Sequence, residues 1–202
     1  MGLKFSYTLL APVYDSIVGS STQEMRLNSL KRINIQTPQH VLINGIGTGL
    51  DLPFLPVNHQ YTATDLTPAM LEKCKARLAQ HNLNMKLHTA DVMRLPFEDN
   101  SFDIVLMNLI LAVVPQPVEA LKEASRVLKP GGKIFIMDKF IRAGQLAPAR
   151  RILNVIIRHI ATRTDVVFEN LLESCPELKL TNDKPALMNG WFRLIDLEKQ
   201  NK

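Results

Sequence analysis

Short apolar runs alternate with amphipathic segments along most of this 202-residue chain, and that alternation limits the folds open to it. In the amphipathic segment after position 67, Leu71, Cys74 and Leu78 recur at three- and four-residue steps, the period of a helix with one apolar face. The apolar runs have the length and composition of buried strands; they are Val41–Ile43, Tyr61–Thr64, Met85–Thr89, Phe102–Met107 and Lys133–Met137. Strands separated by helices are joined by right-handed crossovers, so the sequence predicts an α/β fold with a doubly wound, mostly parallel sheet.

Local signals set the expected helix ends. Thr67 is expected to cap a helix that begins at Pro68, because proline suits the first helical position. A second helix is expected to end at the turn 129–132, and its apolar face is expected to hold Leu121, Ala124 and Leu128.

Further elements are expected on either side of this core. They are helices at 5–18, 23–33 and 147–163 and strands at Leu178–Thr181 and Trp191–Leu197. The last strand is expected to close the sheet in the antiparallel direction. The prediction is therefore one domain over 1–202, with a seven-stranded sheet that includes an antiparallel edge hairpin strand.

A glycine-rich turn, Gly45-Ile46-Gly47-Thr48-Gly49, follows the first predicted strand directly, and Asp65, Asp91 and Asn108 stand at or just after the next three strands. Ligands of open parallel sheets bind beyond the carboxyl ends of the strands. Glycine lets the backbone approach a ligand closely, and an acid there can accept hydrogen bonds from both ribose hydroxyls. These residues predict a pocket for an adenosine-containing molecule. The dinucleotide fingerprint needs a third glycine at position 50, which is Leu here, and this counts against a nicotinamide cofactor.

Linked motifs in this region resemble those of class I S-adenosylmethionine-dependent methyltransferases. They are residues 41–53 (VLINGIGTGLDLP), 64–71 (TDLTPAML), Ala90–Asp91 with Leu95–Phe97 and Ser101–Asp103, and 126–132 (RVLKPGG). The resemblance implies a Rossmann-like methyltransferase fold, with S-adenosyl-L-methionine as cofactor and S-adenosyl-L-homocysteine as product. It also implies three parts: an N-terminal helical cap (1–35), a cofactor-binding core (36–138), and substrate-covering helices with the last two strands (139–202).

The resemblance assigns roles to individual residues. The glycine turn would face the methionine part of the cofactor, Asp65 the ribose, and Asp91 with its neighbour the adenine. Asn108 would lie beside the sulfonium, Tyr14 over the cofactor and Tyr7 beside the acceptor, although ordinary half-buried packing explains the tyrosines equally well. The predicted cofactor-binding residues are Gly45, Ile46, Gly47, Thr48, Gly49, Asp65, Leu66, Met70, Asp91, Val92 and Asn108, and the predicted catalytic residues are Tyr7, Tyr14 and Asn108.

One position departs from the family pattern. Most members carry an acid two places before the first glycine, where this chain has Ile43. Asn44 is adjacent but is expected to point to the opposite face of the strand. Asp51, just after the turn, is expected to compensate electrostatically. A catalytically degenerate binding protein is therefore an alternative to an enzyme.

The acceptor is suggested by segments outside the core motifs. Residues 11–15 (APVYD) resemble the entry region of ubiquinone/menaquinone C-methyltransferases and of bacterial phospholipid N-methyltransferases, and residues 163–172 and 191–194 look closer to the phospholipid enzymes. The first expectation is N-methylation of an ethanolamine-type phospholipid head group, with C- or O-methylation of a quinone precursor or another small aromatic as the alternative. An aromatic carbon needs a nearby base to remove a ring proton, and no such base is evident in the sequence.

The chain carries a formal net charge of +5. The predicted helix at 147–163 joins an apolar stripe to flanking arginines, which suits peripheral contact with an anionic membrane; a core-packed helix with a solvated basic side fits the same pattern. No Asn-Pro-Pro-aromatic run follows the fourth strand, which argues against amino methylation of a flipped base, and no nucleic-acid partner is expected. We expect a cytoplasmic protein, peripheral at the inner face of the membrane if the helix binds lipid, without a metal site. The oligomeric state is left open.

Overall fold

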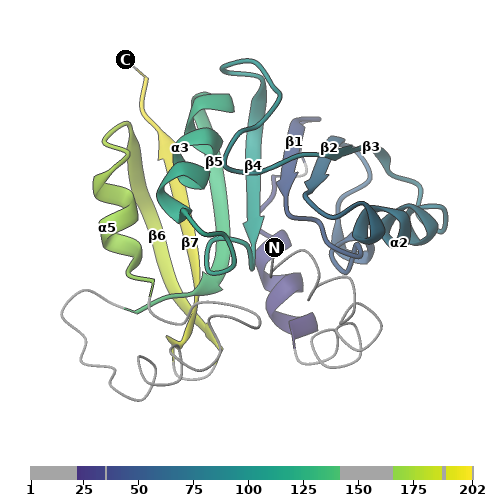
Figure 1. Cartoon of the computed structure of the whole chain (residues 1–202), viewed down its shortest axis with the longest axis horizontal. Helices are drawn as coiled ribbons and strands as arrows, with labels where there is room; N and C mark the ends of the chain where they lie inside the picture. Colours follow the sequence, from purple (N-terminus) through teal and green to yellow (C-terminus); the bar gives the residue numbers. More distant parts are fainter. Residues whose placement is uncertain (1–21, 35, 142–165, 188–189, 202) are drawn as a thin grey trace.

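The computed structural model describes residues 22–34, 36–141, 166–187 and 190–201. Within these ranges seven strands form one sheet in the order β3-β2-β1-β4-β5-β7-β6 (Figure 1). The strands are β1 (His40–Asn44), β2 (Gln60–Asp65), β3 (Asn84–Thr89), β4 (Phe102–Asn108), β5 (Leu128–Lys139), β6 (Leu178–Leu187) and β7 (Phe192–Lys199). The helical elements are residues 22–30, the 3-10 turn η1 (Leu52–Phe54), α2 (Pro68–Leu78), α3 (Pro117–Val127) and α5 (Phe168–Glu173).

The strand order reverses between β1 and β4. Strand β1 pairs in parallel with β2 on one side and with β4 on the other, so the crossovers on the two sides diverge at the carboxyl ends of these two strands. Strand β7 pairs antiparallel with both β5 and β6. The predicted doubly wound, mostly parallel sheet with an antiparallel hairpin is confirmed, and the strand at the edge is β6.

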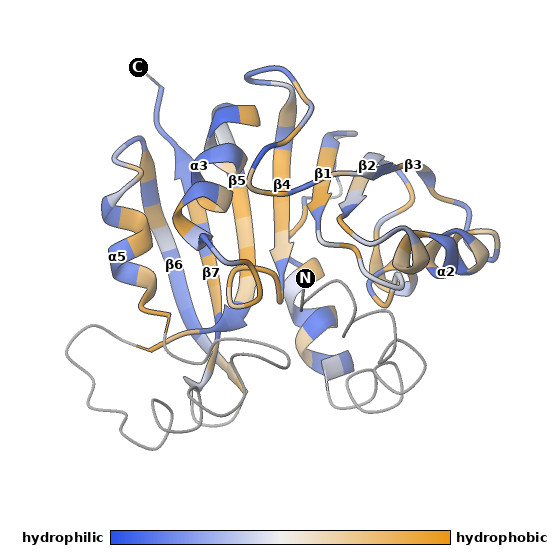
Figure 2. Cartoon of the chain, in the orientation of Figure 1, coloured by the Kyte–Doolittle hydropathy of each residue, from blue (hydrophilic) through white to orange (hydrophobic). Residues whose placement is uncertain are grey.

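Two apolar clusters cover the two faces of the sheet. In β1, Val41 and Ile43 belong to the cluster that includes Leu30 and residues of α2, whereas Leu42 belongs to the cluster that includes residues of α3 and α5. This division follows from the alternation of side chains along a strand. Figure 2 shows the result, with apolar central strands and helices whose hydropathy changes from one side to the other.

Two local predictions are wrong in detail. Leu128 is not on a helix face but is the first residue of β5, where it pairs with Phe102. The next pairing is Ile104 with Lys133, so the residues between Leu128 and Lys133 form an irregularity within the strand and do not precede it. Thr67 lies at the N-cap of α2, but its side chain makes no capping hydrogen bond.

Other predicted elements differ in extent. The helix expected at 23–33 runs over 22–30, and the strand expected at Leu178–Thr181 continues to Leu187. The helices expected at 5–18 and 147–163 lie outside the described residues. None of the helices that the structure describes is long and apolar enough to cross a membrane.

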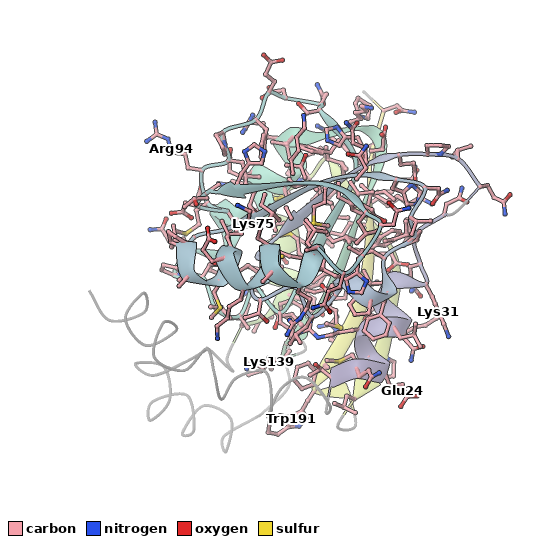
Figure 3. The ribbon with its side chains drawn as sticks, turned by 90° about the vertical axis from the view of Figure 1, so that its right-hand side faces the viewer. Glu24, Lys31, Lys75, Arg94, Lys139 and Trp191 are labelled. Carbon is pink, nitrogen blue, oxygen red and sulfur yellow. The ribbon has the colours of Figure 1, made fainter. Side chains whose placement is uncertain are left out.

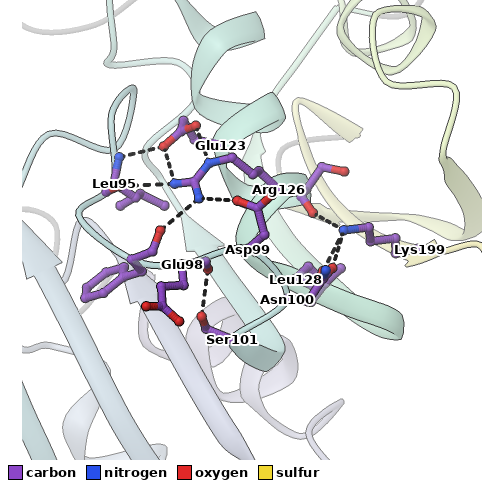
Figure 4. A network of polar contacts seen from close by, with 11 residues as sticks. Leu95, Glu98, Asp99, Asn100, Ser101, Glu123, Arg126, Leu128 and Lys199 are labelled. Carbon is purple, nitrogen blue, oxygen red and sulfur yellow. Dashed lines mark hydrogen bonds and ion pairs between the residues drawn. The ribbon is translucent and has the colours of Figure 1, made fainter.

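A polar network fixes the segment between β3 and β4 (Figure 4). Arg126 of α3 donates hydrogen bonds to the carbonyl oxygens of Leu95 and Phe97 and to the carboxylates of Asp99 and Glu123. These hydrogen-bond acceptors raise the pKa of Arg126. The same segment begins at the carboxyl end of β3. The network therefore also restrains the residues that directly follow β3.

Candidate functional site

A cavity of about 230 Å³ opens at the carboxyl ends of the parallel strands, beside the point where the strand order reverses. It is lined by the loops that follow β1, β2, β3 and β4. The lining residues are Gly45, Gly47, Thr48, Asp65, Leu66, Thr67, Met70, Asp91, Val92, Met93, Leu109, Ile110, Val113, Val114 and Pro115. The position is the one at which open α/β sheets bind their ligands.

The glycine turn forms the floor of this cavity. Gly45 and Gly47 have φ angles of +74° and +59°, a left-handed conformation that side chains disfavour. A Cβ atom added at Gly47 would meet no atom within 4 Å, so the backbone there borders open space. At Gly45 the same atom would lie 2.6 Å from Ile110 Cδ1, so that glycine is needed for packing against the loop after β4.

The Asp65 carboxylate, at the end of β2, is oriented by backbone groups of the cavity. Oδ2 accepts a hydrogen bond from the N–H of Gly47 at 3.0 Å, and Oδ1 accepts one from the N–H of Thr67 at 2.9 Å. Burial raises the pKa of Asp65, and the N–H donors of Thr67 and Gly47 oppose that rise. Each carboxylate oxygen retains a lone pair, so Asp65 can still accept bonds from a diol.

The Asp91 side chain organises the loop after β3 in a similar way. Its Oδ1 accepts a hydrogen bond from the N–H of Met93 at 2.9 Å, which places Val92 between two fixed residues at the cavity wall. The apolar Val92 side chain beside the Asp91 carboxylate suits the face and the edge of a purine ring.

Several predicted site residues line the cavity: Gly45, Gly47, Thr48, Asp65, Leu66, Met70, Asp91 and Val92. Three others do not. Ile46 packs in the apolar cluster beneath the helix at 22–30, and Gly49 packs against Leu52 and Cys74. The third, Asn108, is hydrogen-bonded to Asp51 and Ser29. Tyr7 and Tyr14 lie outside the described residues.

The Asn108 side chain points toward the helix at 22–30. Its Nδ2 donates to Asp51 Oδ2 at 2.9 Å, and its Oδ1 accepts a hydrogen bond from Ser29 Oγ at 3.0 Å. Asp51 Oδ1 in turn accepts a bond from Arg26 Nη1 at 2.5 Å. Figure 3 shows Glu24 projecting outward from the same helix, whereas Arg26 and Ser29 of that helix bond to Asp51 and Asn108 near the strand ends.

Ile43 stands where most members of the resembled family carry an acid, and its surroundings are apolar. Ile43 is buried in an apolar cluster that includes Leu106 of the adjacent strand. Asn44 accepts a hydrogen bond from Thr64 Oγ1 at 3.3 Å through Oδ1, and its buried Nδ2 has no hydrogen-bond partner in the described part of the chain. The carboxylate in this region comes from Asp51, which already bonds Arg26 and Asn108.

Sequence reasoning missed almost half of the lining. The missed residues are Thr67, Met93, Leu109, Ile110, Val113, Val114 and Pro115. Most of them belong to the apolar segment after β4, which reads as ordinary core because none of its side chains is polar. Their only positional signal was the end of the predicted fourth strand.

The charged residues among the lining residues are Asp65 and Asp91, and none of these lining residues is Lys, Arg or His. Two carboxylates favour a cationic ligand, such as a sulfonium, and oppose the two negative charges of a dinucleotide pyrophosphate. The two carboxylates, the open space over Gly47 and the ability of Asp65 to accept hydrogen bonds together fit S-adenosylmethionine.

Comparison with known proteins agrees with this geometry. Residues 42–136 match the family model described as "Methyltransferase domain". The chain is 26% identical to a phosphatidylethanolamine N-methyltransferase of Cereibacter sphaeroides over 191 residues, or 93% of each chain. It is 46% identical to a demethylmenaquinone methyltransferase of Staphylococcus aureus over 79 residues, which are 39% of this chain and 32% of that protein.

Solved structures share the fold. One is the [4+2]-cyclase SpnF, with a TM-score of 0.78, 16% identity and coverage of 98% of this chain and 95% of that one. Another is a S-adenosylmethionine-dependent methyltransferase of Thermotoga maritima described as a possible histamine N-methyltransferase, with a TM-score of 0.70, 20% identity and coverage of 97% and 99%. Residues 42–136 are thus a methyltransferase domain, and this match together with the methyltransferase relatives supports an S-adenosylmethionine-dependent methyltransferase, while the solved structures show the Rossmann-like fold.

Proposed function

We propose that this methyltransferase methylates the amine of an ethanolamine-type phospholipid head group. The observation that carries the proposal is the extent of similarity to the phosphatidylethanolamine enzyme, which spans 93% of both chains. Acceptors of a shared fold are chosen by the segments around the cofactor core, so similarity over those segments is the better guide. The match to the menaquinone enzyme is stronger per residue but covers 39% of this chain.

In the proposed complex, Asp65 accepts hydrogen bonds from the ribose hydroxyls, and Asp91 with Val92 meets the adenine. The turn from Gly45 to Thr48 approaches the methionine part. Met70 and Leu66 complete the apolar surface around the adenosine. These roles rest on the residues that line the cavity and on the fit of its two carboxylates to a cationic cofactor.

The reaction needs alignment more than acid–base chemistry. The lone pair of a neutral amine nitrogen attacks the methyl carbon of the sulfonium, the carbon–sulfur bond breaks, and its electrons stay on sulfur. The amine loses one proton to solvent. Because the leaving sulfur is neutral, positioning of nitrogen, carbon and sulfur in line supplies most of the acceleration. Tyr7 and Tyr14 are proposed to contact the head group and the cofactor.

The test is incorporation of a labelled methyl group from S-adenosylmethionine into vesicles. Vesicles of phosphatidylethanolamine mixed with anionic phosphatidylglycerol would be compared with vesicles of phosphatidylcholine and phosphatidylglycerol. We expect label in monomethylated ethanolamine lipid in the first case and none in the second. A parallel reaction contains free ethanolamine in place of the ethanolamine lipid. Label transferred only to free ethanolamine, or to neither lipid, would contradict a phospholipid acceptor.

The second candidate is C- or O-methylation of a quinone precursor. It is favoured by the 46% identity over 79 residues to the demethylmenaquinone enzyme. Demethylmenaquinone in the same vesicles would become labelled if this candidate holds. S-adenosylhomocysteine binding without methyl transfer to either acceptor would favour a degenerate binding protein.

Membrane contact through the basic residues 147–163 is also a proposal. Co-sedimentation with phosphatidylglycerol vesicles and with neutral vesicles would test it. Binding to the anionic vesicles that falls as salt is raised is the expected result, because the attraction is electrostatic. Equal recovery with both vesicle types would contradict it.

A further inference from the structure

The segment after β4, residues 109–115, forms one wall of the cavity and is held in a strained conformation. Leu109 has a φ of +57°, which a side-chain-bearing residue adopts only when its surroundings impose it. The Leu109 N–H donates to the carbonyl oxygen of Met137 on β5 at 2.7 Å. The wall residues therefore depend on β5 for their position.

A second contact to β5 comes from Asp138, the next residue along that strand. Asp138 is 1% exposed. Its Oδ2 accepts a hydrogen bond from the N–H of Ala112 at 3.0 Å, and its Oδ1 accepts one from the N–H of Lys139 at 2.8 Å. Ala112 lies between the lining residues Ile110 and Val113, so the carboxylate holds the middle of the wall.

The charged groups around Asp138 do not neutralise it by a direct ion pair. In the described part of the chain no cation lies within ion-pair distance of its carboxylate. Lys139 is its neighbour on β5, and Arg193 is its register partner on β7. The Arg193 guanidinium is bonded to Asp183 of β6 and to Glu169 of α5. Residues 109–115 contribute no titratable side chain.

Burial accordingly raises the pKa of Asp138 to about 6, while the N–H donors of Ala112 and Lys139 and the charge of Lys139 lower it. A buried, unpaired carboxylate opposes folding, and an apolar or neutral residue would serve the core better. A buried carboxylate that opposes folding and yet bonds to the wall of a binding cavity is typical of a residue retained for function.

We propose that Asp138 is a positioning residue for the cofactor cavity, which holds the wall 109–115 against the bound ligand through the N–H of Ala112. The proposal rests on the proposed cofactor site and is independent of the acceptor. It predicts that ligand affinity and stability respond in opposite directions when the charge is removed.

The experiment is calorimetric titration of S-adenosylhomocysteine into the full chain and its Asp138→Asn variant at pH 8. An Asn side chain can accept from Ala112 or from the Lys139 N–H but not from both, because its NH₂ group is a donor. We expect affinity at least about tenfold weaker in Asp138→Asn, from the loss of a charge-assisted acceptor. We also expect the variant to melt at the same or a higher temperature than the wild type at pH 8.

Asp103→Asn is the matched control. Asp103 also accepts two hydrogen bonds, from the His40 N–H and Lys129 Nζ, but it lies at the start of β4, away from the cavity. Its substitution is expected to leave affinity for S-adenosylhomocysteine unchanged. An equal loss of affinity in both variants would show a general effect of charge and overturn the proposal.

A second readout is the pH dependence of S-adenosylhomocysteine affinity, which does not require any variant to be more stable than the wild type. Wild-type affinity is expected to fall as pH drops through about 6, where Asp138 protonates, and Asp138→Asn is expected to lack that step. Any change due to Asp65, whose pKa is also raised, stays in both proteins. Wild-type affinity equal to that of Asp138→Asn at every pH overturns the proposal. Failure of the wild type to bind S-adenosylhomocysteine at all would instead refute the cofactor site.

Discussion

The amide of Asn108 donates a hydrogen bond to the carboxylate of Asp51 at 2.9 Å, and this bond joins the end of β4 to the turn after β1. Arg26 and Ser29 extend the contact to the helix at 22–30. The relationship changes the interpretation of both residues. Asn108 and Asp51 organise the strand ends and the covering helix, and neither lines the cavity described here.

The stability of the contact between the helix at 22–30 and the turn after β1 is expected to depend on the ion pair between Arg26 and Asp51. Both side chains are less than a tenth exposed, so Arg26→Met leaves Asp51 as a buried, uncompensated charge. We expect a loss of about 3–5 kcal/mol in the free energy of unfolding. Asp51→Asn combined with Arg26→Met is expected to cost at least about 1 kcal/mol less than the sum of the single changes. Urea denaturation of the four proteins measures the coupling, and strict additivity would contradict it.

Two glycines of the same turn are expected to respond differently to alanine. Both have positive φ, so each substitution costs about 1–2 kcal/mol of strain. At Gly49 the new methyl also meets Leu52 and Cys74, which adds about 1–3 kcal/mol of overpacking. At Gly47 it projects into open space at the cavity floor. Gly47→Ala should therefore weaken S-adenosylhomocysteine binding more, and Gly49→Ala should lower the unfolding free energy more; the reverse order would refute the proposed floor.

Removal of the Asp65 carboxylate is expected to remove most cofactor affinity. Two hydrogen bonds from a ribose to a charged acceptor correspond to a loss of at least about 30-fold in S-adenosylhomocysteine affinity in Asp65→Ala. Calorimetry measures the change, and circular dichroism checks that the variant is folded, because Gly47 and Thr67 also lose their acceptor. Unchanged affinity in a folded variant would place the ribose elsewhere.

The acid that most family members carry is not expected to be accepted at position 43. Ile43 is 1% exposed in an apolar cluster, so Ile43→Asp buries a carboxylate without a designed partner. The expected loss is roughly 3 kcal/mol or more in unfolding free energy. Ile43→Val, the control for lost volume, should cost about 1 kcal/mol. An Asp variant as stable as the wild type, with tighter S-adenosylhomocysteine binding, would show that the site has room for the acid.

The stability contribution of Asp138 is expected to depend on pH with a defined sign. Its folded-state pKa of about 6 lies above its ordinary value of 3.8, so ionisation opposes folding. That penalty is fully present above pH 6 and disappears as pH falls through 6 toward 3.8. The unfolding free energy of the wild type should therefore rise relative to Asp138→Asn by about 2 kcal/mol between pH 8 and pH 4, most of what a shift of about two pKa units represents. Urea denaturation across this range tests it; a constant difference would mean that Asp138 is not buried as a carboxylate.

The sequence by itself determined the order of the seven strands and of the helices at 22–30, α2 and α3 along the chain, and the edge of the sheet at which the cavity opens; it did not predict the short helix α5. Period-2 and period-3.6 patterns report which residues are buried, and crossovers of parallel strands place Gly47, Asp65 and Asp91 at one edge. These are local or topological consequences of the chain, so they could be predicted without coordinates. The extents of β5 and β6 could not, because their pairing with β4 and β7 decides where they begin and end.

Only the tertiary structure decided what the polar residues near the site bond to. Asn108 and Asp51 are 57 positions apart, and Asp138 and Ala112 are 26 apart. No local pattern reports such pairs, because side-chain direction at a strand end depends on the elements packed above it. The apolar wall 109–115 was equally hidden, since its composition is that of a core and its exposure to a cavity arises from the gap between loops of different strands. The physical reason is the same in each case: hydrophobic periodicity encodes burial, whereas the partners of a buried polar group are set by packing between distant segments.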